Sequence, residues 1–155
     1  LWRGIEVKIY ITNDETTTEG YTTFSPLNGD NIRELDSERV ADSECSDILC
    51  PNIIDYIPFQ IILPVVQNYI KKLRRGGNIT IGGTDLYLAS LLVTKRDIPL
   101  DKINELIFGG YQAYQAKSGL VGVNDMLALL EGLGLKIVSK SLIDGYKYLI
   151  VGRKN

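Results

Sequence analysis

Histidine is absent from this chain of 155 residues. Histidine is the usual general base near neutral pH and the commonest metal ligand, so both roles fall to other residue types. Acid–base chemistry would depend on carboxylates, lysine, tyrosine, cysteine or a polarised water. Cysteine is also scarce: Cys45 and Cys50 cannot complete a zinc site alone, and we expect no metal. Two cysteines are not typical of a secreted disulfide scaffold, so we expect buried or half-buried free thiols.

Strong charge and long apolar runs are missing as well. The formal net charge is −2 and the isoelectric point is about 5.2, which argues against strong nonspecific binding to nucleic acid. No apolar run reaches the roughly 18 residues of a membrane span, so we expect no membrane partner. Charged residues interrupt the first ten positions (Arg3, Glu6 and Lys8), unlike a signal peptide, and the expected location is cytoplasmic.

Segments with strand and helix patterns alternate along the chain. Strands are predicted at 6–11, 21–25, 32–36, 47–50, 78–81, 136–143 and 146–153, and helices at 61–73, 86–93, 99–108 and 124–133. Gly76-Gly77 is predicted to end the first helix and Gly82-Gly83 to form a turn. The alternation predicts an α/β fold: a mainly parallel sheet covered by helices on both faces, in one domain spanning residues 5–154. Asp144-Gly145 predicts a type I′ turn, which makes the last two strands an antiparallel hairpin.

Three segments, in this order and spacing, resemble the class I S-adenosylmethionine-dependent methyltransferases. Residues 47–58 resemble the family's fourth strand and the loop after it, and residues 71–81 resemble its glycine-marked approach to strand five. Residues 127–137 resemble its last helix turning into strand six. The resemblance covers roughly residues 46–153, the second half of such an enzyme. It implies a Rossmann-like sandwich, methyl transfer to an unknown acceptor, and S-adenosylmethionine as the cofactor.

The amino-terminal half is reduced relative to that family. The family's first strand ends in a glycine-rich turn followed by a helix, whereas Thr12–Gly20 holds one glycine and is followed by no helix pattern. Ser25-Pro26 stands where the family has an acidic residue for the ribose hydroxyls. We therefore predict weak or absent cofactor binding, which leaves a non-catalytic binding or assembly module as the alternative. A nicotinamide dinucleotide is disfavoured, because the acidic residues of this loop would repel its pyrophosphate.

Candidate site residues follow from the rule that ligands of open α/β sheets collect at the carboxyl ends of strands. The candidates for cofactor binding are Asn13, Ser25, Asp36, Pro51 and Asn52. Asp55, just past predicted strand four, is the candidate catalytic residue, for proton acceptance or substrate positioning. The substrate candidates are Asp85, Tyr111 and Tyr114, and Lys117 lies in the same irregular segment as the two tyrosines.

Most candidates also have a structural interpretation. Asn52 has the position of a turn cap, Asp55 that of a carboxylate at a helix start, and Asp85 that of a helix cap. Asp36 has the position of a strand end, and the tyrosines that of a surface lid. If the strand ends converge, Asn13, Asp36, Asn52, Asp55 and Asp85 would form a carboxylate-rich edge suited to a cation such as the sulfonium cofactor. The partners that the sequence allows are an unknown acceptor and further copies of the chain.

Overall fold

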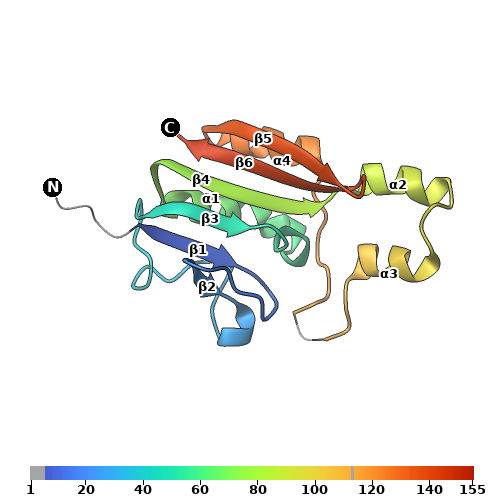
Figure 1. Ribbon diagram of the computed structural model, residues 1–155, viewed down its shortest axis with the longest axis horizontal. Coiled ribbons are helices and arrows are strands. Elements are labelled where there is room, and N and C mark those ends of the chain that lie inside the picture. Colours follow the sequence, from blue (N-terminus) through green and yellow to red (C-terminus); the bar gives the residue numbers. More distant parts are fainter. Residues whose placement is uncertain (1–5, 113) are drawn as a thin grey trace.

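Six strands form one sheet in the order β2-β1-β3-β4-β6-β5 (Figure 1). The computed structural model describes residues 6–112 and 114–155, so residue 5, where the predicted domain begins, lies outside the described residues. β1 to β4 run parallel, and β6 is antiparallel to both of its neighbours, β4 and β5. The predicted fold class is therefore confirmed. The strands are β1 (Val7–Ile11), β2 (Thr22–Phe24), β3 (Cys45–Cys50), β4 (Leu73–Thr84), β5 (Leu135–Ile143) and β6 (Lys147–Lys154).

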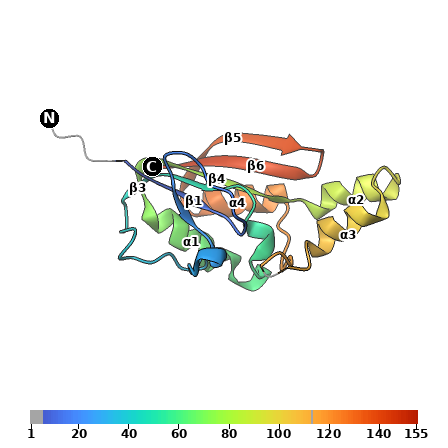
Figure 2. The same cartoon turned by 60° about the horizontal axis from the view of Figure 1, so that its bottom comes forward.

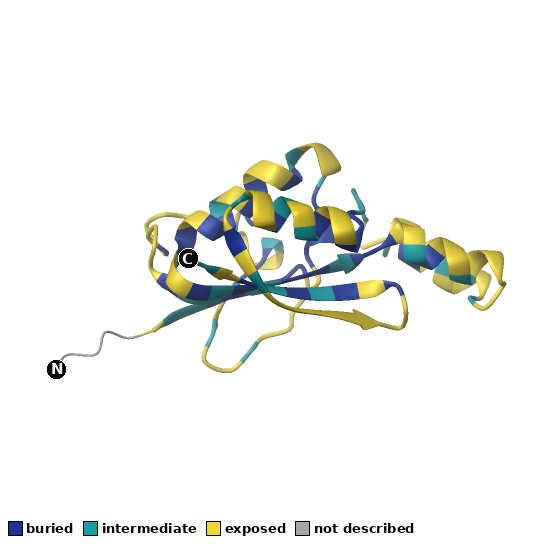
Figure 3. Cartoon of the chain, turned by 90° about the horizontal axis from the view of Figure 1, so that it is seen from above, coloured by how far each residue is buried: buried dark blue, intermediate teal, exposed yellow. Residues whose placement is uncertain are grey.

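The α-helices are α1 (Ile62–Lys72), α2 (Leu86–Thr94), α3 (Leu100–Phe108) and α4 (Val123–Gly132). α1 and α4 lie against the same face of the sheet, whereas α2 and α3 extend beyond its end as an arm that is mostly exposed (Figures 1, 2 and 3). Within residues 6–112 and 114–155, no α-helix covers the opposite face, so the prediction of helices on both faces was wrong. The reason is local: the chain after β1 and after β2 has no apolar stripe with helical spacing. No helix of the described residues is long and apolar enough to cross a membrane.

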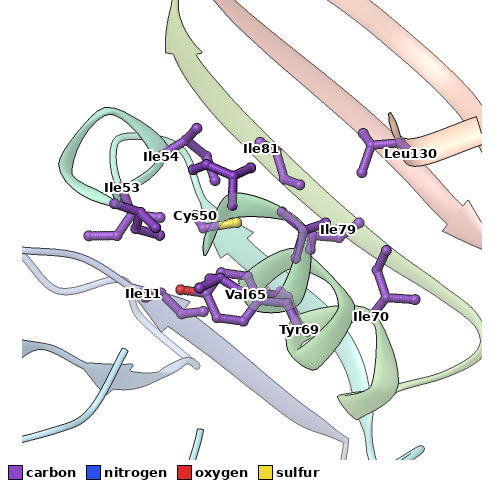
Figure 4. Packing of buried hydrophobic residues seen from close by; sticks show 14 of the residues in the cluster. Ile11, Cys50, Ile53, Ile54, Val65, Tyr69, Ile70, Ile79, Ile81 and Leu130 are labelled. Carbon is purple, nitrogen blue, oxygen red and sulfur yellow. The ribbon is translucent and has the colours of Figure 1, made fainter. Parts of the chain in front are cut away.

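The core lies between the sheet and α1 and α4 (Figure 4). α1 buries an apolar stripe at the helical spacing, comprising Ile62, Val65, Val66, Tyr69 and Ile70. Pro64 lies in the first turn of α1, where its missing N–H has no intrahelical partner to lose, so no kink is needed. The sheet and α4 complete the core with Ile48, Cys50, Ile79, Ile81, Ile150, Met126 and Leu130.

Four local predictions were wrong, and tertiary contacts explain two of them. Residues 32–36 form no strand, because the Leu35 N–H donates to Asn68 Oδ1 of α1 (2.9 Å) rather than to a neighbouring strand. Gly76-Gly77 and Gly82-Gly83 lie inside β4: α1 already ends at Lys72, and Gly82 and Gly83 pair with Leu149 and Tyr148 of β6. α4 begins one residue before Asn124, with Gly122 as its N-cap. The type I′ turn is confirmed by positive φ at both Asp144 (56°) and Gly145 (80°).

Both cysteines are free and buried, as predicted. Burial raises the pKa of the Cys45 thiol to about 11 and raises the pKa of Cys50 further. Because the thiolate is the nucleophile, we expect neither cysteine to react with iodoacetamide near pH 8 in the native protein, and both to react in denaturant. Mass spectrometry counts the added groups, and native modification at the denatured rate would contradict the expectation.

Candidate functional site

A cavity of about 640 Å³ opens at the carboxyl ends of β1, β3 and β4. β1 pairs with β2 on one side and β3 on the other, so the strand order reverses direction at β1. In open α/β sheets this switch point is where ligands bind, and the volume is in the range of small-molecule sites. We call it the carboxyl-edge cavity. Four predicted site residues line it: Asn13, Pro51, Asn52 and Asp55.

Asp55 is at the base of the cavity and is buried. Its carboxylate accepts hydrogen bonds from the Thr84 N–H (2.9 Å) and the Thr84 hydroxyl (2.6 Å), and forms an ion pair with Lys117 Nζ (3.1 Å). Its backbone carbonyl accepts from the N–H groups of Ser118 and Gly119. Asp55 therefore ties the end of β4 to segment 117–119, and its carboxylate has little capacity left to accept a proton from a substrate.

Asp85 acts as a cap between two helices. Its Oδ1 accepts from the Leu88 N–H (3.0 Å) in the first turn of α2, and its Oδ2 accepts from the Val123 N–H (2.8 Å) in the first turn of α4. The side chain is buried and is not among the residues that line the cavity. This geometry matches the capping interpretation, and a substrate role for Asp85 stays an untested prediction.

Side chains of the loop after β1 form hydrogen bonds with one another and with the end of β1. The Tyr10 and Thr16 hydroxyls are 2.7 Å apart, and the Thr12 hydroxyl donates to Asp14 Oδ1 (2.8 Å). Although partial burial opposes it, hydrogen bonds from Thr16 and Thr12 lower the pKa of Asp14, which keeps this cavity-lining carboxylate charged. Asn13 donates from Nδ2 to the Tyr114 carbonyl (2.7 Å) and so joins this loop to the irregular segment before α4.

Two predicted cofactor residues lie away from the cavity. Ser25 is buried, caps the short 3-10 helix Pro26–Asn28 by accepting from the Leu27 N–H, and donates its own N–H to Asp30. Asp36 is exposed and accepts from the Glu38 N–H (2.9 Å) in a turn. The next residue, Ser37, contacts Lys72 at the carboxyl end of α1, so Asp36 lies toward the opposite edge of the sheet. The expected five-residue carboxylate edge does not form, because only Asn13, Asn52 and Asp55 converge.

The two predicted substrate tyrosines are exposed and do not line the cavity. Tyr111 is 96% exposed and Tyr114 55%, and neither lines the cavity. Tyr114 has a left-handed backbone (φ 66°), and its carbonyl accepts the hydrogen bond from Asn13. The segment thus contributes to the site through its backbone and through Lys117, and the stacking role proposed for the tyrosines stays a prediction.

Sequence reasoning missed two walls of the cavity. One is α3, with Lys102, Glu105 and Leu106, and the other is the end of the β5–β6 hairpin, with Tyr146, Lys147 and Tyr148. Burial, with Asp55 and Asp85 nearby, raises the pKa of Tyr148, so its phenol stays neutral and donates to the Val121 carbonyl (2.8 Å). The Asp144-Gly145 turn could have indicated the second wall, because it places the start of β6 beside the end of β4.

The charges around the cavity balance. Asp55 pairs with Lys117, and Glu105 pairs with Lys102 at 3.4 Å. Among the described residues, Lys147 has no carboxylate within ion-pair distance, and Asp14 has no cation. The cavity therefore offers one carboxylate and one ammonium that no opposite charge neutralises. That combination complements a zwitterion better than a simple cation or a phosphate.

Comparison by sequence places the chain in no family: no family model matches it, and no curated protein matches it. Solved structures, in contrast, match the fold over nearly the whole chain. A protein from Pyrococcus horikoshii OT3 has a TM-score of 0.61 at 16% identity, covering 98% of this chain and 73% of its own. The fold of this chain thus occurs in a protein with little sequence similarity to it.

The matching structures include several methyltransferases. The 1,6-didemethyltoxoflavin-N1-methyltransferase of Burkholderia thailandensis, solved with S-adenosylhomocysteine, matches with a TM-score of 0.61 at 11% identity, covering 97% of this chain and 72% of its own. The magnesium protoporphyrin IX methyltransferase of Synechocystis PCC 6803 matches with 0.55 at 14% identity, covering 87% and 52%. The chain has a class I methyltransferase-like fold, as the sequence resemblance predicted, and spans half to three quarters of the length of these three structures.

Proposed function

We propose that the protein is a reduced methyltransferase that binds S-adenosylmethionine weakly in the carboxyl-edge cavity and transfers its methyl group to an acceptor. The observation that carries the proposal is the position of the cavity at the switch point of a methyltransferase-like sheet. When bound, the cofactor supplies an activated methyl group. Direct attack by an acceptor needs positioning more than acid–base catalysis, which suits a chain without histidine.

Two charged residues of the cavity, Asp14 after β1 and Lys147 at the start of β6, suit the amino-acid part of this cofactor. Asp14 is charged and would accept from the α-ammonium group, while Lys147 would pair with the α-carboxylate. Asn52 is exposed in the cavity and has no hydrogen-bond partner among the described side chains, so its amide is free for a ligand. The end of β2 fits the ribose poorly, because Ser25 is buried and already bonded. We therefore expect weak binding, because the site suits the amino-acid part of the cofactor but not its ribose.

A second candidate function is a non-catalytic binding module that keeps the fold. The observation that favours it is that the Asp55 carboxylate already binds Thr84 and Lys117, which leaves it little capacity to accept a proton. A module of this kind would bind a small polar ligand in the cavity without chemistry. The two candidates differ in whether S-adenosylmethionine binds at all.

Titration calorimetry with S-adenosylmethionine and S-adenosylhomocysteine separates them. We expect a dissociation constant of about 0.1–1 mM, or about −4 to −5.5 kcal/mol, because the glycine-rich turn and the acidic residue for the ribose are missing. No binding of either compound at millimolar concentration would reject the first candidate and favour the second. A low micromolar constant would show that other residues replace the glycine-rich turn.

The variant Asn52→Tyr tests whether this binding uses the cavity. A tyrosine at this exposed position fills space in the cavity without disturbing the core, so affinity should fall at least tenfold. Asn31→Tyr is the matched control, because Asn31 is exposed and does not line the cavity. Equal affinity in both variants, with unchanged circular dichroism, would place the ligand elsewhere.

A further inference from the structure

Helix α2 exposes an apolar surface that its own chain does not cover. Its nine residues carry no charge, and only Ala89 among them is buried. Tyr87 is 76% exposed and Leu91 57%, and the arm is visibly exposed along its length (Figure 3). The arm is attached to the body through a small separate cluster of Ala89, Leu106 and Tyr146. A helix that is apolar all round is normally buried on more than one side.

An apolar groove of about 900 Å³ runs beside this helix, on the face of the sheet that α1 and α4 cover. Leu86 and Tyr87 of α2 form one wall, and Phe59 and Leu63 at the start of α1 form another. Asp125 is the one charged residue among those that line the groove. α2 therefore has a double role. Leu86, Tyr87 and Ser90 line the groove. Leu91 lies one turn after Tyr87 on the same side of the helix, and these two exposed side chains form an apolar ridge.

We propose that a second copy of this chain covers this surface, with the α2 ridge of each copy lying in the groove of the other. In a twofold-symmetric contact the same patch must be self-complementary, and a patch that holds both a ridge and a groove meets that condition. The inference does not depend on cofactor binding, because the groove and the carboxyl-edge cavity have no lining residue in common.

The exposed area supports a partner of protein size. Six large side chains of the patch carry on the order of 600 Å² of accessible area, at the upper limit for a monomer and near the roughly 800 Å² that each partner buries in a standard interface. These side chains are Phe59, Leu63, Leu86, Tyr87, Leu91 and Val93.

Other occupants fit this surface less well. A small molecule in the groove would leave Leu91 and Val93 exposed, because neither lines it. An anionic membrane surface would meet no lysine or arginine in the groove, and would be repelled by Asp125. A second α2 helix is uncharged, as the groove requires, and is present at the same concentration as the groove.

Sedimentation of the full chain over a concentration series tests the proposal. We expect a dimer with a dissociation constant in the micromolar range or below. Leu91→Glu places a charge on the ridge and should raise that constant at least 30-fold. Leu100→Glu is the matched control, because Leu100 is 74% exposed on α3 but lies outside the patch, and its constant should stay within threefold of wild type. A wild-type chain that stays monomeric at submillimolar concentration overturns the proposal, as does a Leu91→Glu chain that dimerises normally.

Combining two variants of opposite charge distinguishes a lost contact from a misfolded chain. Leu63→Lys places a cation in the groove and should also raise the dissociation constant at least 30-fold. Mixed together, Leu91→Glu and Leu63→Lys chains should form a heterodimer within tenfold of wild-type affinity, because each mixed dimer keeps one intact contact and gains one ion pair. Failure of the mixture to associate, while each variant keeps its circular dichroism spectrum, overturns the ridge-in-groove arrangement.

Discussion

Replacing Gly82 by alanine is expected to lower the free energy of unfolding by about 3 kcal/mol or more. An added Cβ would lie 2.0 Å from the Pro51 carbonyl oxygen and 2.9 Å from Leu149 Cδ2. The nearer atom belongs to the backbone just after β3, so relief requires separating β3 from β4 in the middle of the sheet. Urea denaturation followed by circular dichroism measures the loss.

Gly132→Ala is the matched control for that change. Gly132 lies in α4, and beyond its chain neighbours and the backbone of its own helix no atom lies within 4 Å of the position of an added Cβ. Alanine there should raise the free energy of unfolding by about 0.5–1 kcal/mol, because a helical glycine carries an entropy cost without any steric use. If Gly82→Ala were as stable as wild type, the close approach of Pro51 to β4 would be wrong.

Replacing Asp55 by alanine is expected to destabilise the protein by about 3–5 kcal/mol. The change would leave the Lys117 ammonium, whose side chain is 9% exposed, without its ion-pair partner. It would also remove the acceptor for both hydrogen bonds from Thr84. Lys117→Ala should cost less, because Asp55 would keep the two bonds from Thr84. The double variant should be more stable than the sum of the two losses predicts, by about 1–3 kcal/mol.

Asp36→Ala is the control variant against which the loss of stability in Asp55→Ala is compared. Asp36 is exposed and accepts one hydrogen bond from the Glu38 N–H, so its loss should cost about 1 kcal/mol or less. Equal losses of unfolding free energy in Asp36→Ala and Asp55→Ala would show that the buried ion pair contributes nothing. A much larger loss for Asp55, with no coupling to Lys117, would instead assign the effect to Thr84 alone.

The sequence predicted the parts of the fold that local patterns control. The strand at β1, the apolar stripe of α1 and the Asp144-Gly145 turn each depend on residues close in sequence, and each was confirmed. The limits of β4 were not predictable in the same way. Gly82-Gly83 has the local preference of a turn, but pairing with Leu149 and Tyr148 of β6 keeps it extended. Tertiary hydrogen bonding overrides propensity there.

The candidate site was predictable in position but not in its contacts. The strand-end rule brings Asn13, Asn52 and Asp55 together, because each directly follows a parallel strand or its first turn. Asp36 was misplaced because the strand predicted before it does not exist. The partners of Asp55 come from β4 and from an irregular segment without any pattern of its own, so no local signal indicates that its carboxylate is occupied.

The position of β6 between β4 and β5 also constrains the order in which the sheet assembles. β5 precedes β6 in the chain but contacts the sheet only through it, so β5 has no strand partner until β6 is in place. The tight turn makes the β5–β6 hairpin a fast local event, whereas pairing β6 with β4 closes a much longer loop. The hairpin is therefore expected to form first and dock onto β4 as a unit. Docking then places Lys154 against the carbonyls of Ile70 (3.0 Å) and Leu73 (2.8 Å), which completes the carboxyl end of α1.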